Sequence, residues 1–215
     1  MSCERTQAVQ SDDLMQRALP RGIDLVASSA GLVMLSPLFA GIALLVAVSS
    51  PGGVFYRARR VGRNGVEFRL LKFRTMRSDA DRIGSGLTSA GDARITSVGR
   101  VLRALKLDEL PQLVNVLLGE MSLVGPRPED PRYIPHYPKA CRRLLQLRPG
   151  ITSAASLAYR NESALLAGDD PERIYIERVL PDKLAIDCAY FESATTASHL
   201  KLIMHTILAS LGLRP

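Results

Sequence analysis

The chain has 215 residues, enough for one sizeable hydrophobic core or one domain with an appendage. Its 28 Lys and Arg residues outnumber 21 Asp and Glu, and the net charge of +7 favours an anionic partner such as nucleic acid, acidic lipid or a phosphorylated substrate. Nucleic acid is disfavoured because aromatic residues make up only 5% and no binding fingerprint is present. The three cysteines form no Cys-x-x-Cys pair, which argues against a zinc site or disulfide framework and favours a reducing compartment.

Residues 1–20 are polar and predict an arm on the protein surface. From Leu25 to Val48 no residue is charged, and as one helix this run would be about 36 Å long, enough to cross a bilayer core. A single transmembrane helix is therefore one interpretation. We favour a re-entrant helix-break-helix hairpin over 21–50, because Ser36-Pro37 interrupts the run and both flanks are basic. The flanking cations are Arg17, Arg21, Arg57, Arg59, Arg60 and Arg63.

Residues 51–215 predict one compact domain that begins with β structure. Asn64-Gly65 lies between two short runs of apolar and aromatic residues, a pattern typical of a β-hairpin. Residues 70–76 continue it as an extended segment, and 77–94 are rich in Gly, Ser and Asp and predict a loop.

Three further segments have apolar residues at the spacing of a helix. Apolar spacing predicts a helix over 94–106 and a second one after Asp108, with Asp108 as its N-cap, Pro111 in its first turn and Gly119 at its end. A stripe over 200–211 predicts an amphipathic helix that packs on the core or, as we favour, lies in a membrane interface. The predicted fold class is helix-rich α+β, with a small β-hairpin and amphipathic interface helices.

The adjacent acids Asp108 and Glu109 are the first candidates for chemistry. Beside basic residues and a helix start, an ionised Asp can attack phosphorus, and a Glu can hold a hard cation such as Mg²⁺. The helix macrodipole and nearby cations would favour ionised Asp108. The alternative is structural: Asp108 is then only a cap and Glu109 only an acid in the first turn.

Cations that could bind phosphate lie in two patterns. Pro126 and Pro128 fix the backbone on both sides of Arg127, which holds one guanidinium with little entropy to lose; the alternative is a rigid turn with a surface arginine. Lys72 and Arg74 alternate with apolar residues and therefore share one strand face, which either lines an anion pocket or is simply solvated.

Two more arginines and the histidines complete the candidates. Arg148 precedes a proline in another rigid turn, and Arg160 lies in a dense polar cluster. The histidines have no metal-ligand spacing and are interpreted as surface or packing residues: His136, His199 and His205.

Taken together, these motifs resemble the bacterial sugar transferases, the monotopic phosphoglycosyl transferase or polyprenyl-phosphate sugar-1-phosphate transferase superfamily, in its minimal catalytic form. The resemblance covers roughly residues 20–212 in order. It is carried by the segments Arg21 to Asp24, Ser36-Pro37, Lys72 to Met76, Asp92 to Thr96, Gly99-Arg100, Leu102-Arg103, Leu107 to Gln112, Asn115-Val116, Gly119, Met121 to Glu129 and Arg148 to Thr152.

The resemblance implies a reaction and a place. Such enzymes transfer a sugar-1-phosphate from a nucleotide diphosphate sugar, usually a UDP-sugar, to undecaprenyl phosphate, with release of UMP, in the first membrane step of a glycoconjugate pathway. They act from the cytosolic face of the bacterial inner membrane, inserted in one leaflet. A homodimer is possible.

The resemblance also implies roles for single residues. Asp108 matches the nucleophile that forms an aspartyl-phosphosugar intermediate, and Glu109 matches the acid that binds Mg²⁺. Lys72 and Arg103 match cations near the phosphates, and Arg127 matches the motif for nucleotide recognition. The further expected substrate-binding residues are Arg74, Pro126, Pro128, Arg148 and Arg160.

Three departures from the family pattern limit what the resemblance implies. Residues 153–162 differ from the usual segment, so the sugar pocket is not carried over. Asp187 matches a Leu-Asp-x-x-Tyr pattern with Ile186 in place of Leu, whereas His199 stands where many members have Asp, and we assign it no catalytic role. The alternative to an enzyme is a non-catalytic adaptor whose basic surface binds anionic lipid and a partner protein.

Overall fold

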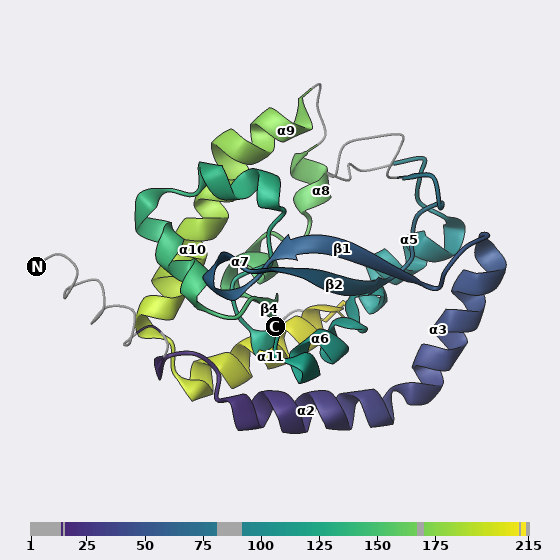
Figure 1. The fold of residues 1–215 in the computed structure, drawn as a ribbon, viewed down its shortest axis with the longest axis horizontal. Helices are drawn as coiled ribbons and strands as arrows, with labels where there is room; N and C mark the ends of the chain where they lie inside the picture. The colour runs from purple at the N-terminus through teal and green to yellow at the C-terminus, as the bar shows by residue number, and fades with distance from the viewer. Residues whose placement is uncertain (1–13, 15, 81–91, 167–169, 211, 214–215) are drawn as a thin grey trace, which may run out of the picture.

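The computed structural model describes residues 14, 16–80, 92–166, 170–210 and 212–213 (Figure 1). Most of the predicted arm over 1–20 and much of the predicted loop over 77–94 lie outside the described residues. The described residues form a helix-rich α+β fold, as predicted, and it contains two small sheets. Helices and strands follow in the order α2 (Arg21–Met34), α3 (Ser36–Ser49), β1 (Phe55–Val61), β2 (Glu67–Phe73), α5 (Ser97–Ala104), α6 (Gln112–Leu118), β3 (Ser122–Val124), β4 (Gly150–Thr152), α7 (Ala154–Ala158), α8 (Glu162–Leu165), α9 (Pro171–Ile174), α10 (Leu180–Ser193) and α11 (Thr196–Ser210).

The predicted β-hairpin is confirmed. Strands β1 and β2 pair antiparallel, with Val61 opposite Glu67. Between them Asn64 and Gly65 have φ of 57° and 78°, the left-handed region that an Asn-Gly turn requires. In Figure 1 the hairpin lies across the middle of the molecule.

The second sheet was not predicted, because its two parallel strands have only three residues each and lie far apart in the sequence. Ser122 pairs with Gly150 and Val124 with Thr152. The backbones continue in close contact beyond the strands, since Gly150 N donates to Pro126 O at 2.9 Å. A Cβ on Gly125 would lie 2.2 Å from the Arg148 carbonyl oxygen, so only glycine fits at this crossing.

The predicted break at Ser36-Pro37 is confirmed. Helices α2 and α3 meet at Leu35 with a bend of 62°, so they do not fold back against each other as a tight hairpin would. Among the described residues no single helix is long and apolar enough to cross a membrane, although this bent pair passes that test by length and composition. Whether it enters one leaflet stays a prediction.

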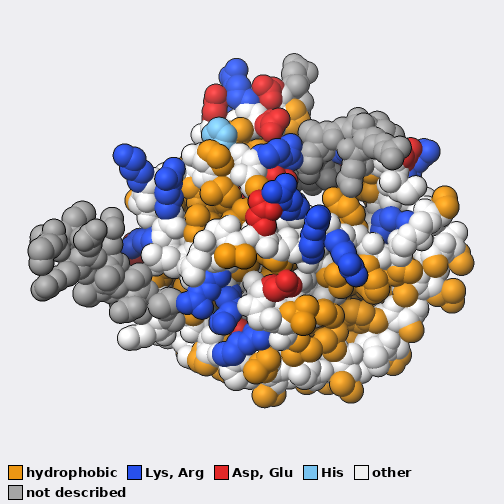
Figure 2. Space-filling model, in the orientation of Figure 1, with side chains coloured by type: hydrophobic (Ala, Val, Ile, Leu, Met, Phe, Trp, Pro, Cys, Tyr) orange, Lys and Arg blue, Asp and Glu red, His pale blue; other side chains and the backbone are white. Residues whose placement is uncertain are grey.

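Both helices of the pair also pack on the rest of the protein. Helix α2 buries Asp24 and Ser28 and packs against α6, while α3 buries Ile42 and Val46 next to Phe73 of β2. Their outer faces are apolar, and Figure 2 shows hydrophobic side chains gathered along the edge where α2 and α3 run in Figure 1. Exposed members of this surface are Val26, Val33, Met34, Leu38, Leu44, Leu45 and Val48.

The largest core lies around α10. It includes Leu180, Leu184 and Phe191 of that helix. The predicted C-terminal helix is confirmed as α11, which buries Leu202 against this core and leaves Leu200, Met204 and Ile207 exposed. It therefore packs on the protein with one face, and its expected contact with a membrane stays a prediction.

His199 is a packing residue, as expected. It is 0% exposed in α11, where Nδ1 shares a hydrogen bond with the Tyr190 hydroxyl and Nε2 one with the Arg17 carbonyl oxygen.

Candidate active site

Asp108 and Glu109 lie in a tight connection between two helices. Helix α5 ends at Ala104, Lys106 takes a left-handed conformation with φ of 58°, and residues 107–109 form one 3₁₀ turn. The prediction that Asp108 caps the second helix is wrong, because α6 begins only at Gln112 with Pro111 before it. The left-handed Lys106 and the 3₁₀ turn occupy the positions that the apolar spacing assigned to the end of the first helix and the start of the second.

Glu109 binds two cations with one oxygen. Its Oε1 accepts from Lys72 Nζ at 2.7 Å and from Arg127 Nη2 at 3.1 Å. Burial acts to raise the pKa of Glu109, but the charges of Lys72 and Arg127 prevail and hold it well below the ordinary value. The structure thus brings a strand residue and a loop residue to one carboxylate.

Asp108 is in the opposite electrostatic situation. It is 6% exposed, and its Oδ1 has no hydrogen-bond partner among the described residues. Burial raises the pKa of Asp108 and the charge of Glu109 adds to this, whereas Lys72 and Arg103 lower it. The expectation that the surroundings favour ionised Asp108 is therefore wrong in sign, because desolvation outweighs the cations.

Arg103 projects toward the same centre from α5. Its Nε donates to Thr75 Oγ1 at 2.8 Å, just after β2. Burial lowers the pKa of Arg103, while the carboxylates of Asp108 and Asp92 raise it in part. Lys72, Arg103, Asp108, Glu109 and Arg127 therefore form one cluster of charges, which we call the dyad cluster.

Asn115 fixes the position of Lys72 relative to the two acids. It is 2% exposed in α6, and its amide pairs with the backbone of β2: Oδ1 accepts from Leu71 N and Nδ2 donates to Arg69 O, both at 2.9 Å. The amide thus acts like one residue of a neighbouring strand. Sequence reasoning gave Asn115 no role, because a buried asparagine in an apolar stripe carries no signal of this pairing.

Two of the predicted substrate-binding arginines have structural partners. Arg74 lies beyond the end of β2 and donates to the carbonyl oxygens of Ser50 at 2.7 Å and Pro51 at 3.1 Å, just after α3. Arg148 Nε donates to the Gly119 carbonyl oxygen at 3.1 Å, at the C-terminal end of α6. These contacts favour helix capping, and a substrate role for either residue stays a prediction.

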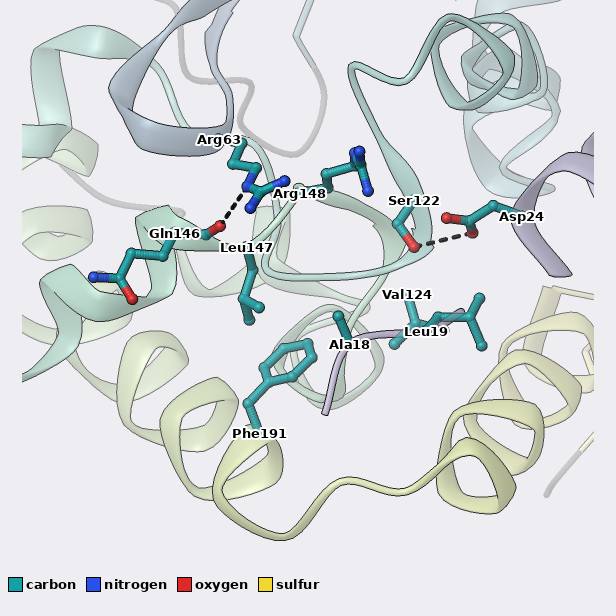
Figure 3. A pocket seen from close by; sticks show the side chains of 10 residues that line it. All are labelled: Ala18, Leu19, Asp24, Arg63, Ser122, Val124, Gln146, Leu147, Arg148 and Phe191. Atoms are coloured by element: carbon teal, nitrogen blue, oxygen red, sulfur yellow. Dashed lines mark hydrogen bonds between the residues drawn. The ribbon is translucent and has the colours of Figure 1, made fainter. Parts of the chain in front are cut away.

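A cavity of about 100 Å³ lies beside Arg148 (Figure 3). Asp24 and Ser122 lie together on one side, where Asp24 Oδ1 accepts from Ser122 Oγ at 3.0 Å and Leu123 N at 2.9 Å. Burial raises the pKa of Asp24. This cavity contains none of the dyad cluster, so we interpret it as part of the joint between α2 and β3.

The remaining predicted substrate-binding residues are Pro126, Pro128 and Arg160. Pro126 and Pro128 are buried on either side of Arg127, which agrees with a fixed guanidinium. Arg160 is half-buried just before α8, and none of the hydrogen bonds or ion pairs found in the described part of the chain involves it. A role for Arg160 in binding substrate stays a prediction.

The dyad cluster fits a magnesium ion held partly by substrate. The described residues contain no group of three or more His, Cys, Asp or Glu that could hold a metal ion by themselves. Mg²⁺ usually takes one or two carboxylates plus substrate phosphates and waters. Asp108 and Glu109 supply two carboxylates. The buried Oδ1 of Asp108, which has no hydrogen-bond partner within the described ranges, is an oxygen that could bind a cation or attack a phosphorus.

The chain is similar to known proteins over most of its length. A model of the bacterial sugar transferase family matches residues 15–212. Exopolysaccharide production protein ExoY of Rhizobium meliloti is 37% identical over 204 residues, 88% of this chain and 84% of that protein. UDP-glucose:undecaprenyl-phosphate glucose-1-phosphate transferase of Caulobacter vibrioides is 36% identical over 199 residues, 91% of this chain and 69% of that protein.

A third relative is longer. UDP-N-acetylgalactosamine-undecaprenyl-phosphate N-acetylgalactosaminephosphotransferase of Aeromonas hydrophila is 37% identical over 162 residues, 74% of this chain but only 37% of that protein. The matched region is thus one part of some relatives and most of others. On the family match and these identities, the chain belongs to the bacterial sugar transferase family.

Proposed function

We propose that the protein transfers a sugar-1-phosphate from a nucleotide diphosphate sugar, of the UDP class, to undecaprenyl phosphate. The relatives named as undecaprenyl-phosphate transferases support this general reaction. The observation that carries it is Asp108, a buried carboxylate whose Oδ1 has no hydrogen-bond partner in the described part of the chain, with cations from three separate elements around it. A diphosphate donor requires such a concentration of positive charge.

The proposed mechanism has two displacements. Asp108 Oδ1 attacks the sugar-bearing phosphorus, the bond to the nucleotide phosphate breaks, and UMP leaves with that electron pair. A lipid phosphate oxygen then attacks the phosphorus of the aspartyl-phosphosugar, and Asp108 is released as a carboxylate. Lys72 and Arg103 would stabilise negative charge on the equatorial oxygens in both steps.

Glu109 and Arg127 would bind the donor rather than react. Glu109 would hold Mg²⁺ together with substrate phosphates, and the ion would neutralise charge that develops on the diphosphate. Lys72 and Arg127 both donate to Oε1 of Glu109, and no hydrogen bond to Oε2 is found among the described residues. Oε2 is therefore the oxygen that would bind the ion. Arg127 presents a guanidinium fixed by buried prolines to the nucleotide phosphate.

We further propose that the bent pair α2–α3 and the exposed face of α11 lie in one leaflet of the bacterial cytoplasmic membrane, with the dyad cluster on the cytosolic side. This proposal is supported by the apolar outer face of α2 and α3 and by the exposed apolar side chains of α11. An acceptor with its phosphate at headgroup depth requires an active site held at that surface.

The test is UMP release by membrane-bound wild type with a panel of UDP-sugars, undecaprenyl phosphate and Mg²⁺. We expect release with one or a few donors, loss on chelation, and loss of at least 10³-fold in Asp108→Asn, because an amide is a poor nucleophile toward phosphorus. The matched control is Asp182→Asn, an exposed aspartate of α10, which should retain activity. A radiolabelled sugar phosphate trapped on wild type without acceptor would identify the covalent intermediate.

The alternative is a non-catalytic adaptor that binds anionic lipid through its basic surface. It predicts no release of UMP from any donor, together with binding to anionic vesicles that Asp108→Asn leaves unchanged. Figure 2 shows Lys and Arg side chains spread over one face of the molecule. In the adaptor hypothesis these side chains would bind the anionic lipid. The adaptor does not explain why the buried Oδ1 of Asp108 has no hydrogen-bond partner among the described residues, so we favour the enzyme.

A further inference from the structure

Arg103, the cation that α5 contributes to the dyad cluster, is held by the hydroxyl group of Thr75. Its Nε donates to Thr75 Oγ1 at 2.8 Å. In the described part of the chain, neither Nη atom of Arg103 has a hydrogen bond or an ion pair. Lys72 and Arg127, in contrast, both donate to Glu109. Because the Thr75 oxygen is neutral, it fixes Arg103 without neutralising its charge, and the two Nη groups stay available to a phosphate.

Helix α5 lies close enough to Thr75 for this hydrogen bond because of Gly99, one helical turn before Arg103. A Cβ on Gly99 would lie 2.0 Å from the Thr75 carbonyl oxygen, so only glycine fits there. The same carbonyl oxygen accepts from the backbone N of Thr96, the residue that caps α5, at 3.0 Å. Residues four apart share one face of a helix. Helix α5 therefore lies with Gly99 against the backbone of Thr75, and the next turn brings Arg103 to its hydroxyl.

Thr75 also connects Arg103 to strand β2, which carries Lys72. It lies shortly after the end of this strand and is 5% exposed. Lys72 contacts Glu109, and both β2 and α5 pack against the 3₁₀ turn that contains Asp108 and Glu109. The hydroxyl of Thr75 therefore fixes the cation of the helix relative to the cation of the strand, beside the two acids.

We propose that Thr75 is a positioning residue whose hydroxyl orients the Arg103 guanidinium, so that its Nη groups bind a phosphate of the donor. The inference rests on the proposed function, in which Arg103 stabilises negative charge on the phosphate oxygens. Thr75 acts only through Arg103 and does not touch the substrate. A carboxylate in place of the hydroxyl would compete with the phosphate for the guanidinium. Without any acceptor, the arginine side chain regains rotamer freedom, and binding a phosphate then costs the entropy of ordering it.

The first experiment measures UMP release by Thr75→Val, which removes the hydroxyl and keeps the shape of the side chain and the backbone carbonyl. We expect kcat/KM to fall about 10- to 100-fold, the range for one hydrogen bond to a charged group. Thr75→Ser keeps the acceptor oxygen and should retain most of the activity. The matched control is Thr196→Val, the same exchange at an exposed threonine of α11, which should change activity little.

A double-variant cycle separates positioning from a structural role. Arg103→Lys keeps a positive charge but has no Nε–H for the hydroxyl to hold. In that background Thr75→Val should lower kcat/KM by less than about threefold, because the group through which Thr75 acts is already gone. An equal loss in both backgrounds would overturn the proposal, and so would unchanged activity in Thr75→Val alone.

The second experiment does not depend on turnover. Inorganic pyrophosphate with Mg²⁺ replaces the donor, and the thermal midpoint of the full chain in detergent measures its binding. Thr75→Val should need about tenfold more pyrophosphate than the wild type for the same rise in midpoint, whereas Arg103→Lys and the double variant should need equal concentrations. The midpoint without pyrophosphate shows whether each variant is folded. Thr75→Ala takes the place of Thr75→Val if valine does not fit.

An equal need for pyrophosphate in the wild type and Thr75→Val would overturn the proposal, and so would a wild-type midpoint that pyrophosphate does not raise. Absence of UMP release from every UDP-sugar, together with the expected pattern of pyrophosphate binding, would count only against the proposed function.

Discussion

Lys72 Nζ lies 2.7 Å from Glu109 Oε1, although the two residues belong to a β-strand and a 3₁₀ turn separated by helix α5. The same ammonium is the largest of the charges that lower the pKa of Asp108. One cation thus holds the proposed metal-binding acid and tunes the proposed nucleophile. Loss of Lys72 should therefore change both donor binding and pH dependence.

We predict that Lys72→Met lowers kcat/KM by about 10²-fold and shifts its acid limb to higher pH. Asp108 must be ionised to react, and its pKa, already raised by burial, rises further without Lys72. Activity is then lost at a higher pH as the solution is acidified. The measurement is the pH profile of UMP release.

The matched control is Arg69→Met, an exposed cation on the same strand, whose acid limb should coincide with that of the wild type. A Lys72→Met profile with an unchanged acid limb would show that Lys72 does not act on Asp108.

Asn115 provides the second prediction. Asn115→Ala removes the partners of Leu71 N and Arg69 O at once, and we expect a loss of about 2–4 kcal/mol in the free energy of unfolding. Turnover per folded molecule should also fall, because β2 carries Lys72. Chemical unfolding in detergent and UMP release give the two quantities. Asn161→Ala, at an exposed asparagine, is the control and should change either by little; equal effects of both variants would contradict the role of Asn115.

Much of the site could be predicted because its chemistry lies in consecutive residues. The Asp108-Glu109 pair, the proline-flanked Arg127 and the Asn-Gly hairpin are local patterns, and the structure brings the first two together through Glu109. The break before Pro37 was likewise local, since proline lacks the N–H that a continuous helix needs.

What sequence reasoning missed depends on contacts over long chain distances. The parallel strands β3 and β4 pair residues near 123 and 151, and three-residue strands have no periodicity to read. The pKa direction of Asp108 depended on how much water the fold excludes, which neighbouring charges in the sequence do not reveal. Arg74 alternates correctly with apolar residues but lies past the end of β2, where it binds the carbonyl oxygens after α3.

Asp187 gives a prediction about stability. It is 3% exposed, accepts from Ala155 N at 2.9 Å, and burial raises its pKa to about 6. The folded state therefore holds a proton between pH 3.8 and about 6 that the unfolded state releases, so this group's contribution to stability is lost as pH rises through that window. Above it the ionised carboxylate destabilises the fold by up to about 3 kcal/mol.

Asp187→Asn removes that pH dependence and keeps an acceptor for Ala155 N. We expect this variant to be more stable relative to the wild type at pH 7.5 than at pH 4. The difference between the two free energies of unfolding should change by about 1–3 kcal/mol in favour of the variant over that range. A difference between Asp187→Asn and wild type that stays constant from pH 4 to pH 7.5 would exclude this account.

The bend between α2 and α3 has an identifiable chemical cause. Pro37 has no N–H to donate to the Val33 carbonyl oxygen, and the Ser36 hydroxyl donates to that oxygen instead, at 2.8 Å. In the double variant Ser36→Ala, Pro37→Ala, the N–H of residue 37 is restored and the hydroxyl is gone. We expect a continuous helix of about 43 Å, long enough to span a bilayer core.

Cysteine labelling in sealed vesicles tests both the bend and the membrane placement. With native cysteines replaced by serine, Gln16→Cys and Val66→Cys place labels before α2 and in the hairpin. In the otherwise native chain both should react from the same face. In the double variant they should react from opposite faces, whereas the control Ser29→Ala should behave like the native chain. Labelling of the native chain from opposite faces would show that the apolar pair spans the membrane despite its bend, because only a crossing segment separates its two ends.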